Sequence, residues 1–190
     1  MAETPNDTTG GTRERPQPES RFEPQEAFAR LGAIVLGRPL GEVLRTVADL
    51  VAATVPGADE VSVTLLEGEK AQSVAFSGRL AATLDERQYE AGFGPCLDSA
   101  QSGQNLRIDD TRHESRYPDF ARTAARQGVR SSISVALPMP QRVLGAINIY
   151  QFDSDPLDAD AEQLAETFAG YAAVALANAA LFASTADLAS

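Results

Sequence analysis

The sequence predicts an α+β fold in which helices pack on a central antiparallel sheet. A hairpin pattern over residues 131–152 is the first indication, because Ile133, Val135 and Leu137 share one face and Ile147 and Ile149 continue it. The second is the order of elements, with helices at both ends and short strands joined by hairpin-compatible loops between them. A chain of 190 residues, 43% of them hydrophobic, can bury one substantial core.

The N-terminal part divides into a tail and two helices. Residues 1–24 hold four prolines among mostly polar residues, so we expect a disordered tail there and a folded domain over residues 25–183. A short helix is predicted over residues 25–36. Apolar residues then recur at helical spacing from Leu40 to Val51, and Pro56 and Gly57 end this second helix.

Strands and short helices follow. Alternation predicts strands at 61–66 and 71–78 around a turn at Gly68, and a brief strand at 106–108. Residues 80–103 are irregular and helical in short pieces, with Asp85 as a possible cap and Pro95 opening a helical turn. A helix is predicted at 118–128. After the hairpin, Asp158 caps a long helix over residues 157–190.

The second face of the strands carries small and hydroxyl-bearing side chains, which packing against helices does not require. We interpret this face as the floor of a ligand cavity. Its predicted residues are Ser62, Thr64, Ser132, Ser134, Ala146, Asn148 and Tyr150.

Charge and composition exclude several classes. A net charge of -11 argues against general binding to nucleic acid or to an anionic membrane surface. The single cysteine excludes an internal disulfide, no apolar run reaches 18 residues, and the N-terminus lacks a signal-peptide pattern. We therefore expect a cytoplasmic protein without a membrane partner.

Five segments, in their order and spacing, resemble the GAF domain family, specifically the GAF domains of actinobacterial GAF–ANTAR regulators. They are PGADEVSVTLLE (56–67), LDERQYEAGFGPCLDSAQSG (84–103), LRIDD (106–110), GVRSSISVALP (128–138) and VLGAINIY (143–150). An alanine-rich helix completes the resemblance, which covers about residues 25–183.

The resemblance implies a PAS-related sheet with the N- and C-terminal helices on one face and a small-molecule cavity with short helices on the other. It also implies a sensor rather than an enzyme. In GAF–ANTAR proteins an RNA-binding ANTAR domain follows and causes transcription antitermination, but no ANTAR segment is present before Ser190. RNA binding is therefore expected only if such a domain follows.

Residues 92–98 and 109–120 are the predicted cavity lid, since glycines and polar groups concentrate there. The lid residues predicted to touch ligand are Gly94, Cys96, Asp110, Tyr117 and Phe120. A first-turn position would favour a Cys96 thiolate, which Asp98 would oppose, so a redox role and an inert packed thiol both remain open.

Metal, cofactor and catalytic sites are not expected. His113 is the only histidine and its charged neighbours indicate a surface loop, so neither a multi-histidine metal site nor haem ligation is predicted. The aspartates near Asp158 lack the glycine and glutamate of an EF-hand. A sulfoxide reductase of the GAF type requires several active-site cysteines, and only Cys96 is present.

Arginines gather between Arg107 and Arg130. They indicate either an anionic ligand, such as a cyclic nucleotide, at the cavity mouth, or a solvated face with local pairs such as Asp119 with Arg122.

The final helix carries two apolar stripes, one for the sheet and one for a partner helix, which predicts a homodimer. The predicted dimer residues are Phe168, Tyr171, Ala175, Asn178 and Phe182, and the second stripe holds Val174, Ala177, Leu181 and Leu188. Two functions stay open: a ligand sensor with an open cavity, or an interaction module whose cavity is filled by Phe93, Tyr117 or Phe120.

Overall fold

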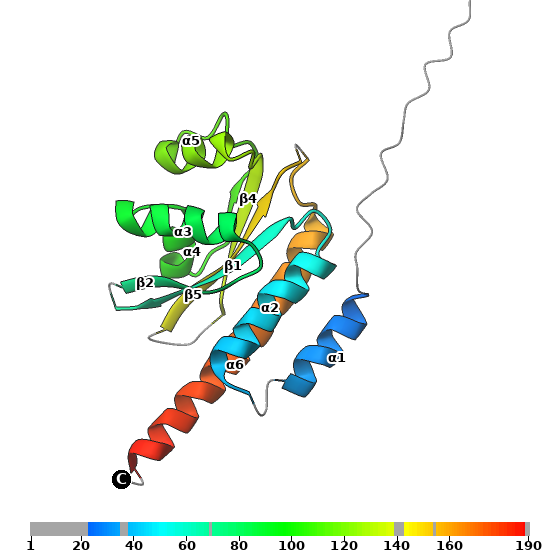
Figure 1. The fold of residues 1–190 in the computed structure, drawn as a ribbon, viewed down its shortest axis with the longest axis vertical. Helices are drawn as coiled ribbons and strands as arrows, with labels where there is room; N and C mark the ends of the chain where they lie inside the picture. Colours follow the sequence, from blue (N-terminus) through cyan, green and yellow to red (C-terminus); the bar gives the residue numbers. More distant parts are fainter. Residues whose placement is uncertain (1–22, 35–37, 69, 139–142, 154, 189–190) are drawn as a thin grey trace, which may run out of the picture.

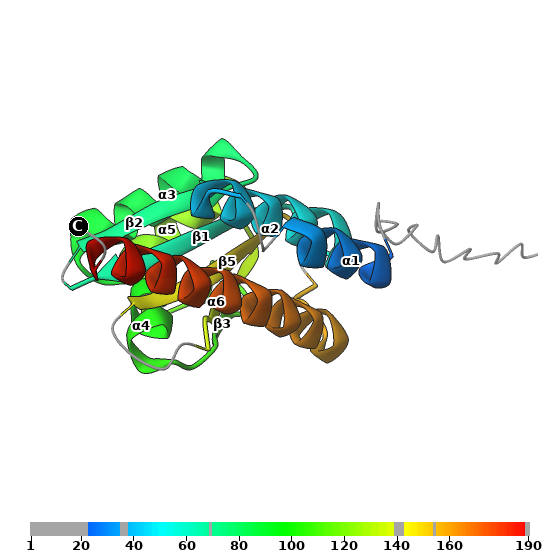
Figure 2. The ribbon, with the colours of Figure 1, turned by 90° about the horizontal axis from the view of Figure 1, so that it is seen from below.

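The computed structural model describes residues 23–34, 38–68, 70–138, 143–153 and 155–188. Five antiparallel strands form one sheet with the order β2-β1-β5-β4-β3. Helices cover both faces of this sheet (Figures 1 and 2). The predicted α+β class is confirmed.

The sheet is built from two hairpins and a short edge strand. β1 (Glu60–Glu67) pairs with β2 (Lys70–Phe76), and β4 (Ser131–Ala136) pairs with β5 (Val143–Gln151). β3 (Leu106–Ile108) extends β4 at one edge. Gly68 turns the first hairpin at a φ of 64°, a left-handed conformation that glycine adopts without a Cβ penalty.

Helices α1 (Pro24–Ile34), α2 (Leu40–Thr54) and α6 (Ala159–Leu188) cover one face. The apolar face of the sheet packs against them in a single core that includes Val63, Ile133 and Ile149. Phe168 of α6 lies in this core with its ring 5.0 Å from that of Phe28. The predicted alternation of the strands is therefore confirmed, with its apolar face holding the terminal helices.

Helices α3 (Arg79–Ala91), α4 (Pro95–Ser102) and α5 (Pro118–Arg126) cover the other face. The short-piece interpretation of residues 80–103 is wrong in its first half, because α3 is one continuous helix of 13 residues. Asp85 is consequently not a cap but a fully buried residue in the middle of that helix. Asp158 does cap α6, since its Oδ1 accepts a bond from the backbone N–H of Ala161 at 2.8 Å.

The C-terminal helix packs within the chain through residues of the stripe that was predicted to face a partner helix. Phe168 and Ala175 are buried within the chain, and Tyr171 stacks on Phe28 with ring centroids 5.4 Å apart. Val174 is 52% exposed and Ala177 is exposed. The predicted dimer residues Phe168 and Ala175 are thus corrected to core residues, because the heptad stripe packs on α1 and the sheet. Asn178 is half-buried, and the side chain of Phe182 lies outside the described residues.

Candidate functional site

The predicted cavity floor is one continuous surface of the sheet. Ser62 and Ser134 flank Asn148 in register, and Ser132 lies beside Tyr150. All seven predicted floor residues are buried: Ser62, Thr64, Ser132, Ser134, Ala146, Asn148 and Tyr150. The strands therefore bring these residues together as the sequence predicts, but helices cover them.

Asp85 on α3 is the centre of a buried polar cluster on this surface. Its carboxylate accepts hydrogen bonds from the Tyr150 hydroxyl at 2.5 Å and from the Ser73 hydroxyl at 2.8 Å. The Asn148 amide donates to Thr64 Oγ1 at 2.8 Å and, at 3.4 Å, to Asp85 Oδ1. Burial raises the pKa of Asp85, and the hydrogen bonds from its neighbours oppose that rise.

The cluster occupies the space in which an open cavity was expected. Tyr89, also on α3, places its hydroxyl 2.7 Å from Thr64 Oγ1 and 3.0 Å from Ser73 Oγ. Most of the polar capacity of the central floor is thus satisfied within the protein. An exception is Asn148 Oδ1, a buried acceptor without a partner among the described residues.

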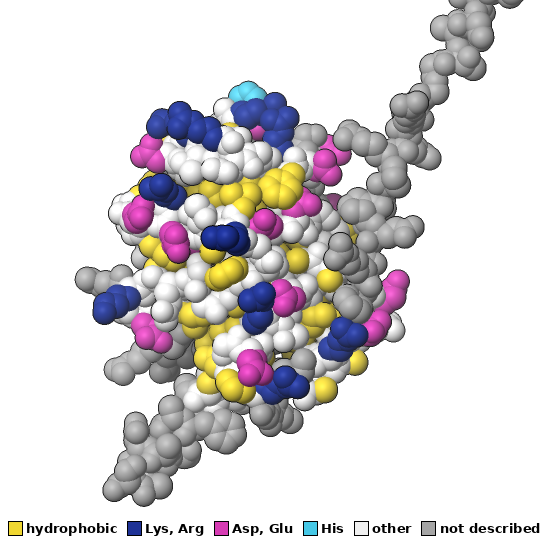
Figure 3. All heavy atoms as spheres, in the orientation of Figure 1, with side chains coloured by type: hydrophobic (Ala, Val, Ile, Leu, Met, Phe, Trp, Pro, Cys, Tyr) yellow, Lys and Arg dark blue, Asp and Glu magenta, His cyan; other side chains and the backbone are white. Residues whose placement is uncertain are grey.

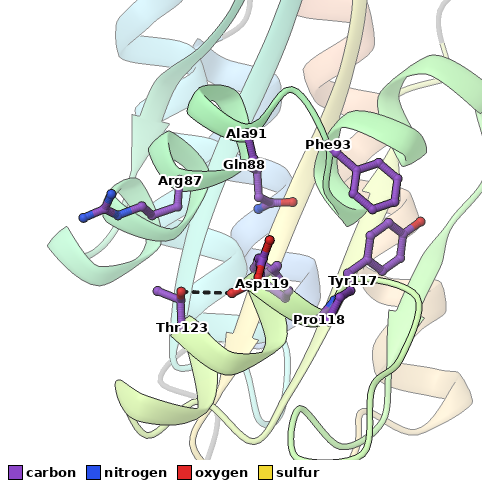
Figure 4. Close-up of a pocket in the computed structure, with 9 residues that line it drawn as sticks. Arg87, Gln88, Ala91, Phe93, Tyr117, Pro118, Asp119 and Thr123 are labelled. Carbon is purple, nitrogen blue, oxygen red and sulfur yellow. Dashed lines mark hydrogen bonds between the residues drawn. The ribbon is translucent and has the colours of Figure 1, made fainter.

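A pocket of about 300 Å³ lies next to this cluster, between α3 and α5. Figure 4 shows the residues that line it, which come from the two helices and the loops that flank them. They are Arg87, Gln88, Ala91, Phe93, Tyr117, Pro118, Asp119, Phe120 and Thr123. Phe120 also approaches Tyr150, with ring centroids 6.4 Å apart, so the pocket adjoins the Asp85 cluster directly.

Gln88 connects the pocket to the cluster. It is 1% exposed, and its Oε1 accepts a hydrogen bond from the backbone N–H of Cys96 at 2.9 Å. Among the described residues, the acceptors of its Nε2 are the Tyr150 hydroxyl at 3.4 Å and the Leu84 carbonyl at 3.5 Å, both distant. Gly94 packs so closely on this amide that a Cβ there would lie 2.3 Å from Oε1.

The predicted lid residues separate into two groups. Tyr117 and Phe120 line the pocket, and Gly94 and Cys96 lie behind it against Gln88. Asp110 does not line the pocket: it lies in a surface loop, where the Arg112 guanidinium and the His113 ring bond to it. The hydrogen bonds from Arg112 are the main reason why the pKa of Asp110 is held far below its ordinary value.

Cys96 lies in the first turn of α4, as predicted, but it is completely buried. Burial raises the pKa of its thiol well above the ordinary value, and the nearby Asp85 carboxyl raises it further. Burial therefore outweighs the helix terminus, which favours the inert, packed thiol among the two interpretations left open by the sequence.

Three of the arginines that gather in the sequence lie on the other side of α5, at the end of the molecule where Figure 3 shows Lys and Arg side chains. Arg112, Arg122 and Arg126 line a separate, shallow groove there. Asp119 accepts a bond from Arg122 at 3.2 Å, so the local pair predicted from the sequence is present. These arginines do not line the pocket between α3 and α5.

Within the described ranges, no group of three or more His, Cys, Asp or Glu side chains could hold a metal ion. No helix of the described part is long and apolar enough to cross a membrane.

The family follows from the sequence model that matches this chain. The model of the GAF domain matches residues 37–177, which include the whole sheet and about the first two thirds of α6. The chain belongs to the GAF family. A comparison with curated proteins gives no match.

Solved GAF structures share this fold at low sequence identity. The phycocyanobilin-bound GAF domain of a cyanobacterial phytochrome is 15% identical, with 84% of this chain and 97% of that chain covered and a TM-score of 0.65. The GAF domain of a phosphoenolpyruvate-protein phosphotransferase from Coxiella burnetii is 17% identical, with 85% of this chain and 96% of that chain covered and a TM-score of 0.65. The reduced fRMsr of Staphylococcus aureus is 15% identical, with 80% of this chain and 94% of that chain covered and a TM-score of 0.63.

Two residues that matter most were missed as functional candidates in the sequence. Asp85 and Gln88 lie in a polar stretch, LDERQYE, that is typical of an exposed helix. Their spacing of three places them on one helix face, which was the available signal. The sequence does not reveal that this face packs on a polar sheet.

Proposed function

We propose that this GAF domain is a sensor that binds a small molecule between α3 and α5. The observation that carries the proposal is the pocket of about 300 Å³ and the buried Gln88 amide that lines it. GAF domains generally act in sensing and signalling. Pockets that bind small molecules are typically apolar, with a few fixed polar groups, and this pocket fits that description.

Hydrogen bonds from the pocket to α4 support a route for the signal. Gln88 accepts from the Cys96 N–H, and the Tyr117 hydroxyl donates to Asp98 at 2.8 Å. Cys96 and Asp98, the two residues of α4 in these hydrogen bonds, both lie in its first turn. A ligand that moves Gln88 or Tyr117 would therefore act on α4.

The other end of α4 is joined to α6. Ser99 donates to the Gln104 carbonyl at 2.8 Å, and Asn105 donates to Glu166 of α6 at 2.7 Å. Arg107 pairs with Glu162 of α6 at 2.5 Å. We propose that these contacts transmit ligand binding to α6, and that α6 forms a homodimer through its outward face, where Val174 and Ala177 lie.

The cellular role is proposed from the sequence resemblance to GAF–ANTAR regulators. The chain would act in the cytoplasm as the sensor half of a transcription antitermination regulator and would perform no catalysis. The burial of its single cysteine supports a non-catalytic role, since a thiol reductase needs an accessible thiolate.

An alternative is a GAF module used only for dimerisation or protein–protein interaction. The observation that favours it is the Asp85 cluster, which fills the centre of the polar face without a ligand. Phe93, Tyr117 and Phe120, which this alternative expects to fill the cavity, instead line a pocket with space between them.

The mass of the freshly purified protein under native and denaturing conditions distinguishes the two functions. The sensor predicts an additional mass of a few hundred daltons that is lost on denaturation. A native mass equal to that of the bare chain or its oligomer favours the interaction module. A bare monomer would contradict the proposed homodimer.

A further inference from the structure

We infer that the ligand of the α3–α5 pocket is an uncharged, planar molecule of one or two rings that presents a hydrogen-bond acceptor to Gln88. This inference rests on the proposed function and adds the chemical class of the ligand. It combines the size of the pocket, the rings around it, the pairing of its charges and the single donor at its inner end.

Size and shape limit the ligand first. A volume of about 300 Å³ is at the lower end of the range for small-molecule pockets, roughly 300–1,000 Å³. Phe93, Tyr117 and Phe120 supply three aromatic rings, and Phe93 lies 5.1 Å from Tyr117 between ring centroids. Aromatic walls favour a flat partner that packs by offset or edge-to-face contact.

The charges of the pocket favour an uncharged ligand. Arg87 and Asp119 are its charged lining residues among those described, and their formal charges cancel. Each also has a partner outside the pocket: Arg87 pairs with Glu90 at 3.0 Å, and Asp119 pairs with Arg122. Neither side chain requires a ligand charge, and an anion would meet no unpaired cation there.

The donor at the inner end is the Gln88 amide. Its orientation is set by the bond from the Cys96 N–H to Oε1, which places Nε2 beside the Tyr150 hydroxyl and the Leu84 carbonyl. Distances of 3.4 and 3.5 Å from Nε2 to its acceptors are weak hydrogen bonds for a side chain that is 1% exposed. A carbonyl oxygen or ring nitrogen at this position would satisfy the amide.

The two hydroxyl-bearing residues of the lining, Tyr117 and Thr123, offer no comparable donor, since the Tyr117 hydroxyl already donates to Asp98 at 2.8 Å. The Thr123 hydroxyl already donates to the Asp119 carbonyl at 2.9 Å, the bond drawn in Figure 4. Gln88 is therefore the group that would distinguish one flat ligand from another. The affinity of the pocket for different flat ligands should therefore depend on their hydrogen-bond acceptor and not on the ring that carries it.

Three probes of matched size test this class: naphthalene, quinoline and quinoline-4-carboxylate. They share a bicyclic ring, and they differ in having no acceptor, one uncharged acceptor, or an added negative charge. Binding to the full chain is measured at pH 7.5 from ¹H–¹⁵N spectra, including the side-chain amide signals of Gln88. One hydrogen bond predicts that quinoline binds about 3- to 10-fold more tightly than naphthalene, although naphthalene is the more hydrophobic.

The variant Gln88→Leu should remove or reverse this preference, while Arg122→Gln, which lies outside the pocket, should keep it. Because the wild-type comparison of the probes needs no variant, a folding defect in Gln88→Leu does not affect the test. Equal binding of naphthalene and quinoline, or tightest binding of the carboxylate, would overturn the class but not the sensor function. Absence of binding by all three would also overturn the class, and the native mass measurement then decides the proposed function independently.

Discussion

The hydroxyl of Tyr150 donates a hydrogen bond of 2.5 Å to Asp85 Oδ1, which joins the second strand of the central hairpin to the middle of α3. Both side chains are almost completely buried. Among the described residues, hydroxyl and amide groups donate to this carboxyl and no cation pairs with it. The polar face of the sheet is thereby fixed to the helix that also carries Gln88.

The pH dependence of stability should report the burial of Asp85. Because the pKa of Asp85 is raised in the folded state, the folded protein holds this proton at pH values where the unfolded chain, with a pKa of about 3.9, has lost it. The contribution of Asp85 is greatest at low pH, and it declines as pH rises toward the folded pKa by about 1.4 kcal/mol per pH unit.

The variant Asp85→Asn isolates this contribution, since other titrating groups are common to both proteins. Urea unfolding from pH 4, near the unfolded-state pKa, up to pH 8 should show wild type losing stability relative to Asp85→Asn as pH rises. A difference that is independent of pH would show that Asp85 does not have a raised pKa.

Gly94→Ala should damage the pocket through Gln88. The φ of Gly94 is 167°, an extended conformation open to any residue, so the effect is steric. A Cβ 2.3 Å from Gln88 Oε1 must displace that amide, at a cost of about 1–3 kcal/mol in urea unfolding. The matched control is Gly41→Ala, an exposed position of α2 with nothing within 4 Å, which should be neutral or stabilising. Equal stability changes in the two variants would contradict this account of Gly94.

Asn105→Ala should loosen the first half of α6. The Asn105 amide donates to Glu162 and Glu166 and its Oδ1 accepts from the Ala136 N–H, so one side chain ties the sheet edge to the helix. Hydrogen–deuterium exchange over residues 159–168 should increase severalfold. Arg45→Gln, which breaks an exposed ion pair on α2, serves as the control and should leave this segment unchanged. Unchanged exchange in Asn105→Ala would argue against α6 being held through this residue.

Cys96 should be unreactive in the folded protein. Its thiol is buried and its pKa is raised, so both access and thiolate fraction are low. A thiol-disulfide reagent such as DTNB should modify it at pH 8 at least about 100-fold faster in denaturant than in buffer. Rapid modification of the native protein would instead support the redox role that the sequence left open.

The sequence predicted the sheet well because its signals are local. Ile133, Val135 and Ile149 alternate with small residues, and period-two patterns specify which face is buried. The floor of the polar face was predicted from the same alternation. What the pattern does not contain is the partner: Asp85 is 65 residues from Tyr150 along the chain, and its contact depends on how α3 packs.

The long helix was harder to interpret for a different reason. Alanines occur on several faces of α6. The heptad stripe through Phe168 and the second stripe through Val174 therefore both satisfied helical spacing. The packing of Phe168 into the core beside Phe28, with Val174 left exposed, distinguishes them. Ring contacts between distant segments are not encoded in the periodicity of either one.

The central claim, that a small molecule occupies the α3–α5 pocket, is tested most directly by native mass measurements on wild type and a pocket-filling variant. Ala91→Trp places a large ring at an exposed lining position, and Ala159→Trp places the same ring at an exposed position at the start of α6. The account predicts a retained ligand in wild type and Ala159→Trp and a bare Ala91→Trp. A wild-type protein isolated without ligand, or a ligand retained equally by all three proteins, would contradict it.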